Sequence, residues 1–156
     1  MNDTAVASEQ YRIEYDSDVI IARAAAARMA GRAGFPKKSC DEISISVSEL
    51  ATNIVKYAPP GTIHIRISPG PPPVFVVVAE DHGAGIENVD NAFAEFHTDR
   101  GPTLSPDGFV RPLKDGLGCG LSAVRRLMDT VSVDTVAGRG TRITATRAAN
   151  AGQDPP

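Results

Sequence analysis

The stretch DEISISVSELATNIVKY, residues 41–57, decides the fold because it predicts one long amphipathic helix. Pro36 and Ser39 are expected to begin this helix, with Asp41 and Glu42 in its first turn. Its apolar side chains recur in steps of four and three, the spacing of a single helix face: Ile43, Val47, Leu50, Ile54 and Tyr57. The helix is therefore expected to present one continuous apolar face.

Two polar residues of the same helix, Glu49 and Asn53, are four positions apart and therefore share a face beside the apolar stripe. A carboxylate there can act as a general base, and an amide oxygen can bind Mg²⁺. Mg²⁺ keeps several waters and often takes only one or two protein ligands plus nucleotide phosphates, so a single Asn is enough. Taken alone, the pair is also what an ordinary polar flank of an amphipathic helix looks like.

On the N-terminal side of this helix, the sequence predicts one strand and one further helix. Residues 11–15 alternate in polarity and indicate a short strand. Asp16 or Ser17 is then expected to cap an alanine-rich helix that runs to about Ala33 and is closed by Gly34.

On the C-terminal side, the run at 59–61, Pro-Pro-Gly, ends the long helix and two strands follow. The first, residues 62–68, places its three isoleucines on one face, and the turn at 69–73 is too proline-rich to continue a ladder. The second, residues 74–79, is a continuous apolar run and therefore predicts an interior strand.

The last third of the chain predicts a lid, a third helix and a hairpin. A short helix is expected over 88–96 and a long loop over 97–115, so that 88–115 forms a lid. Residues 116–120 open the third helix, and strands at 132–136 and 141–146 are joined by a turn. This order of elements predicts an α+β two-layer sandwich, with a mixed, largely antiparallel sheet and the helices on one face.

Length and composition fit one globular domain. The chain has 156 residues, of which 42% are hydrophobic and 22% charged. We expect a single domain over 11–147, with flexible ends at 1–10 and 148–156. The net charge of -3 and the lack of a basic stripe argue against nucleic acid as a partner.

Membranes and metals bound by cysteine or histidine are also not expected. The sequence has no apolar run long enough to cross a membrane and no secretory signal at its start, so a cytoplasmic, reduced protein is expected. Cys40 and Cys119 are expected to be buried or half-buried thiols, and His64, His82 and His97 have no partner pattern for a metal.

Asp81 follows the interior strand and precedes Gly83 and Gly85. Its carboxylate accepts hydrogen bonds only and can therefore receive an amino group such as that of adenine. The glycines allow a ring to lie against the backbone. An ordinary turn after a strand is the alternative interpretation of these residues.

The motif GLGCG, residues 116–120, directly precedes a helix, where backbone N–H groups suit a phosphate chain. It is neither a dinucleotide fingerprint, because Leu121 stands where that pattern needs a small residue, nor a P-loop. A flexible hinge is the alternative. Lys114 lies just before this motif and is a candidate to contact a terminal phosphate. The motif GRGT, residues 138–141, lies in the last hairpin, where a simple turn also explains it.

The four motifs together say more than each does alone. SELATN at 48–53, DHGAG at 81–85, GLGCG at 116–120 and GRGT at 138–141 lie on a helix, a strand end, a loop-to-helix start and a hairpin. This order resembles the ATP-binding boxes of the GHKL superfamily. The small size resembles its serine-kinase branch, the bacterial anti-sigma factors and switch kinases, and the motifs look most like the RsbT-type switch kinases. The resemblance covers about residues 11–147.

The resemblance implies a Bergerat ATP-binding fold and a role for each motif. Glu49 would be the base toward a substrate hydroxyl, Asn53 would hold Mg²⁺, and Asp81 would select adenine with help from Thr141. The remaining nucleotide-site residues implied by the resemblance line the base or wrap the phosphates: Gly83, Gly85, Ile86, Lys114, Gly116, Leu117, Gly118, Cys119, Gly120 and Leu121.

The implied function is an ATP-dependent serine/threonine protein kinase of a partner-switching module, with a STAS-type antagonist protein as its substrate. An anti-sigma factor that sequesters a sigma factor, and a nucleotide-gated activator of a phosphatase, stay open as alternatives. A homodimer is among the expected assemblies, because helices cover only one face of the sheet. The segment 88–115 is longer than in these kinases, which separates this chain from their usual pattern.

Overall fold

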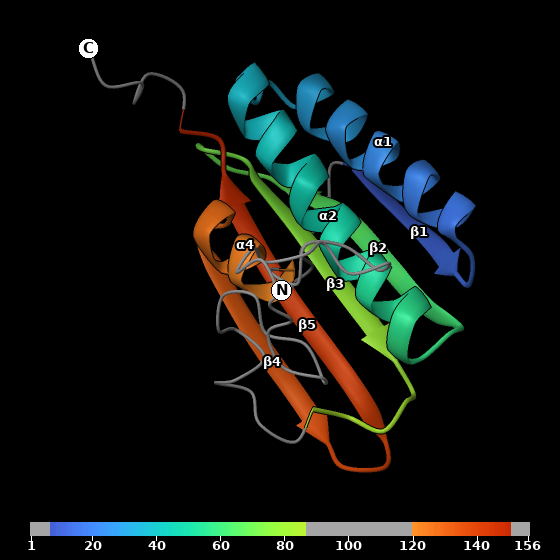
Figure 1. Cartoon of the computed structure of the whole chain (residues 1–156). Coiled ribbons are helices and arrows are strands. Elements are labelled where there is room, and N and C mark those ends of the chain that lie inside the picture. The colour runs from blue at the N-terminus through green and yellow to red at the C-terminus, as the bar shows by residue number, and fades with distance from the viewer. Residues whose placement is uncertain (1–6, 87–119, 151–156) are drawn as a thin grey trace, which may run out of the picture.

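The computed structural model of the chain describes residues 7–86 and 120–150, which form a two-layer α+β sandwich (Figure 1). Three helices lie on one face of a five-stranded sheet, so the fold class expected from the sequence is confirmed. The elements in chain order are β1 (Ala7–Ile13), α1 (Asp16–Arg32), α2 (Lys37–Tyr57), β2 (Gly61–Ser68), β3 (Val74–Asp81), α4 (Gly120–Leu127), β4 (Thr130–Val136) and β5 (Gly140–Ala148).

The sheet has the strand order β1-β2-β3-β5-β4, and every pairing among the described strands is antiparallel. The strand predicted from the apolar run at 74–79 is the central strand β3, as expected of an interior strand. The connection from β3 to the outer pair β5-β4 passes through the part of the chain that contains α4.

The N-terminal boundaries differ from those expected. Strand β1 begins at Ala7 and pairs with β2 as far back as Ile67, so residues 7–10 belong to the sheet and not to a loose end. Helix α1 is capped at Tyr15, and neither Asp16 nor Ser17 is its cap. The side chain that serves this end is Asp18, whose carboxylate accepts hydrogen bonds from the backbone N–H groups of Glu14 and Tyr15 at 3.0 and 2.9 Å.

Helix α2 confirms most of the predicted stripe. It begins at Lys37, so Asp41 and Glu42 lie in its second turn and not in the first. The four positions from Ile43 to Ile54 are buried under the helix, but Tyr57 is half exposed at its last turn and does not belong to the core. Alternation predicts the β2 face correctly, because the three isoleucines at 63, 65 and 67 are buried beneath the helices.

The core between the layers is built mainly from aliphatic side chains. Its largest fully buried members are Phe75, Ile13, Ile43, Leu50, Ile63, Ile65 and Ile67. Cys40 is buried, its thiol donates to the Phe35 carbonyl, and burial raises the pKa of that thiol, as fits a packing residue. Within the described residues, no helix combines the length and the apolar character that a membrane crossing requires.

Several sequence-based expectations fall outside the described residues. They are the short helix and lid over 88–115, the start of the glycine motif at 116–119, and the ends at 1–6 and 151–156. Lys114, Gly116, Leu117, Gly118 and Cys119 therefore stay predictions.

Candidate functional site

Glu49 and Asn53 lie on the side of α2 that packs against α4. The first residue of α4, Gly120, is so close to them that a Cβ added to it would lie 3.0 Å from Glu49 Oε2 and 3.6 Å from Asn53 Oδ1. The structure thus brings together residues that are about 70 positions apart in sequence. We call Glu49, Asn53, Gly120 and the following Leu121, whose side chain is buried in the core, the helix cluster.

The Glu49 carboxylate is half-buried, and burial raises its pKa above the usual range of a glutamate. Lys56, two turns further along α2, acts in the opposite direction and is the smaller effect. A carboxylate in this environment is more basic than one in water, which suits a group that removes a proton.

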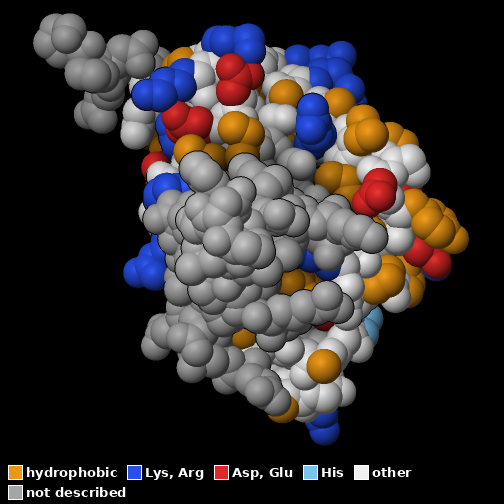
Figure 2. All heavy atoms as spheres, in the orientation of Figure 1, with side chains coloured by type: hydrophobic (Ala, Val, Ile, Leu, Met, Phe, Trp, Pro, Cys, Tyr) orange, Lys and Arg blue, Asp and Glu red, His pale blue; other side chains and the backbone are white. Residues whose placement is uncertain are grey.

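A hollow of about 310 Å³ lies between α1 and α2 and includes Glu49 in its wall. Its other lining residues among those described are Arg23, Asp41, Ser44, Ile45 and Ser48. The surface of this helix-covered face is mixed, with Lys, Arg, Asp and Glu side chains where α1 ends and α2 begins and hydrophobic side chains on the α1 side (Figure 2). Glu49 therefore borders both the start of α4 and a space open to solvent.

Asp81 is the last residue of β3 and lies opposite Thr141 of β5 in the sheet register. Its Oδ1 accepts a hydrogen bond from the Gly83 N–H at 2.9 Å, which orients the carboxylate at the strand end. The second oxygen stays available as an acceptor, because each carboxylate offers two. We call Asp81, Gly83, Gly85, Ile86 and Thr141 the strand cluster.

Thr135 of β4 is a residue of this region that the sequence did not single out. Its hydroxyl accepts a hydrogen bond from the Ile86 N–H at 2.8 Å and lies 3.1 Å from the Thr141 hydroxyl. It thereby joins the chain after Gly85 to the strand that carries Thr141. The only signal in the sequence was the alternation of β4, which places Thr135 on the helix-facing side of the sheet.

Gly85 has a structural reason to be glycine. Its φ is +84°, and an added Cβ would lie 2.8 Å from the Val136 carbonyl oxygen. The neighbouring Ala84 carbonyl accepts the Gly138 N–H at 2.8 Å, so this turn is fastened to the β4-β5 hairpin. Close packing of protein on protein thus accounts for this glycine, and contact with a ligand ring stays a prediction.

The two clusters border the same half of α2. Gly83 of the strand cluster lies beside the helix end, since a Cβ added there would be 2.5 Å from the Cβ of Ala58. Asn53 of the helix cluster is five positions before Ala58 in the sequence. The C-terminal half of α2 therefore runs from Gly120 of the helix cluster to Gly83 of the strand cluster.

The donor set near Gly120 suits a hard cation. An amide oxygen and a carboxylate are oxygen ligands of the kind that Mg²⁺ prefers. Among the described residues, no group of three or more His, Cys, Asp or Glu side chains is arranged to hold a metal. Asn53 with a nucleotide phosphate fits a Mg²⁺ ion that takes few protein ligands and keeps several waters.

Comparison with known proteins gives the class of this chain. Residues 15–147 match the family described as histidine kinase-like ATPase domain, and the chain belongs to that family. It is 35% identical over 135 residues to the serine/threonine-protein kinase RsbT of Bacillus subtilis (strain 168), which covers 86% of this chain and 91% of RsbT. Its enzyme class is therefore that of the protein serine/threonine kinases.

One solved structure supports the fold. Full-length ShkA in complex with AMPPNP matches with a TM-score of 0.50 and 18% identity, over 95% of this chain and 33% of that one. The histidine kinase domain from the Erythrobacter litoralis EL346 blue-light activated histidine kinase matches with a TM-score of 0.47 and 19% identity, over 86% of this chain and 60% of that one. This chain thus spans less than two thirds of either structure, and the match to ShkA shows the fold alone.

Proposed function

We propose that this chain is a cytoplasmic kinase that transfers the γ-phosphoryl group of ATP to a serine of a STAS-type antagonist protein in a bacterial partner-switching module. The observation that carries the proposal is the position of Glu49. Its half-buried carboxylate lies between the first residue of α4 and a hollow that opens to solvent. A base for phosphoryl transfer needs both neighbours, because it must reach the phosphate on one side and the incoming hydroxyl on the other.

The strand cluster is assigned to the base of the nucleotide. The acceptor oxygen of Asp81 receives the adenine amino group, and Thr141, placed opposite it by the register of β3 and β5, assists. Gly83 N–H and the Thr135 hydroxyl hold the strand ends in place. Phosphates are assigned to the start of α4, where the first N–H groups of the helix have no partner within the helix. Gly116, Gly118 and Lys114 are predicted to add to this contact.

Glu49 is assigned the proton transfer. As the serine oxygen forms its bond to the γ-phosphorus, Glu49 accepts the hydroxyl proton, and the bond from that phosphorus to the bridging oxygen of ADP breaks. Its raised pKa makes Glu49 a better proton acceptor than an exposed glutamate. Asn53, together with phosphate oxygens, would hold a Mg²⁺ ion, which would neutralise part of the phosphate charge. The hollow lined by Ser44, Ile45 and Ser48 offers the serine a path to Glu49.

The direct test uses purified protein, radiolabelled ATP, Mg²⁺ and STAS-type proteins from the same organism. If the proposal is correct, one of these STAS-type proteins carries a labelled phosphoserine, and ADP is released in equal amount. A chain that binds ATP, labels none of them and forms a stable complex with a sigma factor would instead act by sequestration. A chain whose ATP-bound form raises the turnover of a phosphatase without labelling a STAS protein would be a nucleotide-gated activator.

A further inference from the structure

Helix α4 is held against α2 at both of its ends. Its first residue, Gly120, adjoins Glu49 and Asn53, as described above. Its last residue, Leu127, is linked to α2 through a side chain that comes from neither helix, Arg147 of β5. The two points of attachment on α2 are Glu49 and Glu42, which are seven positions apart and therefore lie on the same side of that helix.

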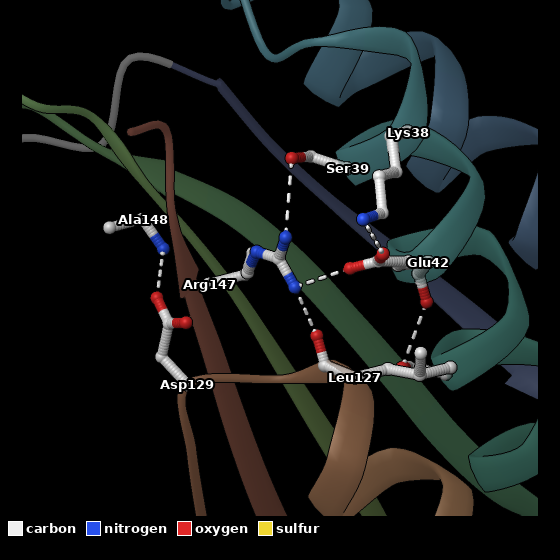
Figure 3. A network of polar contacts seen from close by, with 8 residues as sticks. Lys38, Ser39, Glu42, Leu127, Asp129, Arg147 and Ala148 are labelled. Carbon is white, nitrogen blue, oxygen red and sulfur yellow. Dashed lines mark hydrogen bonds and ion pairs between the residues drawn. The ribbon is translucent and has the colours of Figure 1, made fainter. Parts of the chain in front are cut away.

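Arg147 joins three elements (Figure 3). Its Nη1 donates to Glu42 Oε2 of α2 at 2.6 Å and also to the carbonyl oxygen of Leu127 at the end of α4. Its Nη2 lies 3.4 Å from the hydroxyl of Ser39, one turn earlier in α2. Lys38 is the second cation near Glu42, at 4.0 Å. The two N–H bonds of one guanidinium nitrogen thus reach a carboxylate and a carbonyl, while the second nitrogen of the same planar group faces Ser39.

This contact is sheltered from water. The side chains of Arg147 and Glu42 are 21% and 17% exposed, whereas those of Arg142 and Glu80, the other ion pair that includes a β5 arginine, are 55% and 40% exposed. Screening by solvent is therefore weaker for Arg147, and a carbonyl at a helix C-terminus favours a nearby cation. Arg147 therefore holds the C-terminal end of α4 in place and is more than an exposed surface charge.

The turn after α4 is fastened to the same strand. Asp129 N–H donates to the Thr146 carbonyl, and the Ala148 N–H donates to Asp129 Oδ2, both at 2.8 Å. Helix α4 has eight residues and so is about 12 Å long, short enough to move as a rigid rod. Because α4 is rigid, a change of tilt at its C-terminal end also moves its N-terminal end, where Gly120 adjoins Glu49 and Asn53.

We infer that Arg147 is a positioning residue of the nucleotide site: it anchors the C-terminal end of α4 to Glu42 and so sets where the first N–H groups of α4 meet the phosphates. This inference rests on the proposed function. Arg147 touches no member of either cluster, and its effect passes entirely through α4. Losing it should weaken ATP binding and leave the proton transfer by Glu49 in place, because Glu49 belongs to α2.

The experiment compares Arg147→Met with Arg142→Met in the full chain. Both variants remove an arginine of β5 and one ion pair, but Arg142 lies on the face of the sheet opposite α4. We expect Arg147→Met to weaken Mg-ATP binding in calorimetry about tenfold, to raise KM for ATP by a similar factor, and to change kcat less than about twofold. Arg142→Met should leave the Kd within about twofold of the wild type.

Two further variants keep the inference testable if Arg147→Met does not fold. Arg147→Lys keeps the charge but not the fork, and Glu42→Gln removes the acceptor charge, so both should weaken ATP binding several-fold in protein shown to be folded by its thermal transition. Wild-type Kd values in folded Arg147 and Glu42 variants, or equal losses in Arg142→Met, would overturn the inference alone. Failure of the wild type to bind ATP would overturn the proposed function instead.

Discussion

The two clusters of this site are built by different means. The strand cluster is held by the register of β3, β4 and β5 and by short hydrogen bonds from Gly83 to Asp81 and from Ile86 to Thr135. The helix cluster forms where α4 approaches α2, with Gly120 near Glu49. Its geometry therefore depends on how α4 is placed, and a side chain remote from the cluster, Arg147, contributes to that.

This difference in construction suits the two tasks of the site, which are recognition of the adenine base and transfer of the phosphoryl group. Recognition of a base needs fixed donors and acceptors, and the ends of the inner strands β3 and β5 supply them because each strand constrains its neighbour. Phosphoryl transfer needs phosphates to enter and leave, and a short helix bounded by a glycine can accommodate that more easily than a strand. Substitutions in the strand cluster should therefore act on binding, and those that displace Glu49 in the helix cluster should act on the transfer rate.

The largest effect on binding is expected for Asp81→Asn. The amide places a donor where the adenine amino group needs an acceptor, so affinity for Mg-ATP should fall about 100-fold, or roughly 2.7 kcal/mol. Calorimetry measures this directly. Asp134→Asn is the matched control, since Asp134 is an exposed carboxylate of the neighbouring strand β4. Unchanged affinity in Asp81→Asn would remove Asp81 from the adenine site.

A smaller effect, on rate rather than on binding, is expected for Gly120→Ala. The new Cβ would lie 3.0 Å from Glu49 Oε2, so the carboxylate must move by a few tenths of an ångström. The transfer rate at saturating ATP should fall about tenfold, because catalysis is sensitive to such displacements. Gly31→Ala is the control, since Gly31 lies in α1 with no atom within 4 Å of an added Cβ. A normal rate in Gly120→Ala would show that this approach is not part of the mechanism.

The smallest effect is on stability and depends on pH. Burial raises the pKa of Glu49, so the folded protein binds a proton that the unfolded chain has already lost, and stability falls as pH rises through the raised pKa. The Glu49→Gln side chain carries no charge, so the stability of this variant does not fall in this pH range. Its melting temperature without nucleotide should equal that of the wild type below the ordinary pKa of a glutamate and exceed it at neutral pH. A difference of the opposite sign at neutral pH would mean that the folded state stabilises the charged carboxylate.

Local patterns predicted the fold well. The helical spacing from Ile43 to Ile54 and the alternation of β2 gave the buried faces correctly, because burial on one side leaves a period in the sequence. The same spacing failed at Tyr57, since a period assigns a face but not the point at which the layer beneath the helix ends. The start of β1 at Ala7 was missed because residues 7–10 are small or polar, and pairing with β2 decides their conformation.

Only part of the candidate site could be predicted from the sequence. Glu49, Asn53 and Asp81 stand in motifs whose chemistry is visible in the sequence. Thr135 and Arg147 look like ordinary strand residues, and their partners Ile86 and Glu42 are 49 and 105 positions away. Only the folded chain brings those partners together, so residues that position others are harder to predict than residues that bind or react.

The central claim, that Glu49 is the base of a phosphoryl transfer from ATP, is tested most directly by single-turnover transfer with Glu49→Ala at saturating Mg-ATP and STAS-type substrate. The account predicts an ATP affinity within about twofold of the wild type and a transfer rate at least about 100-fold lower. Full transfer by Glu49→Ala, with ATP binding intact, would contradict it.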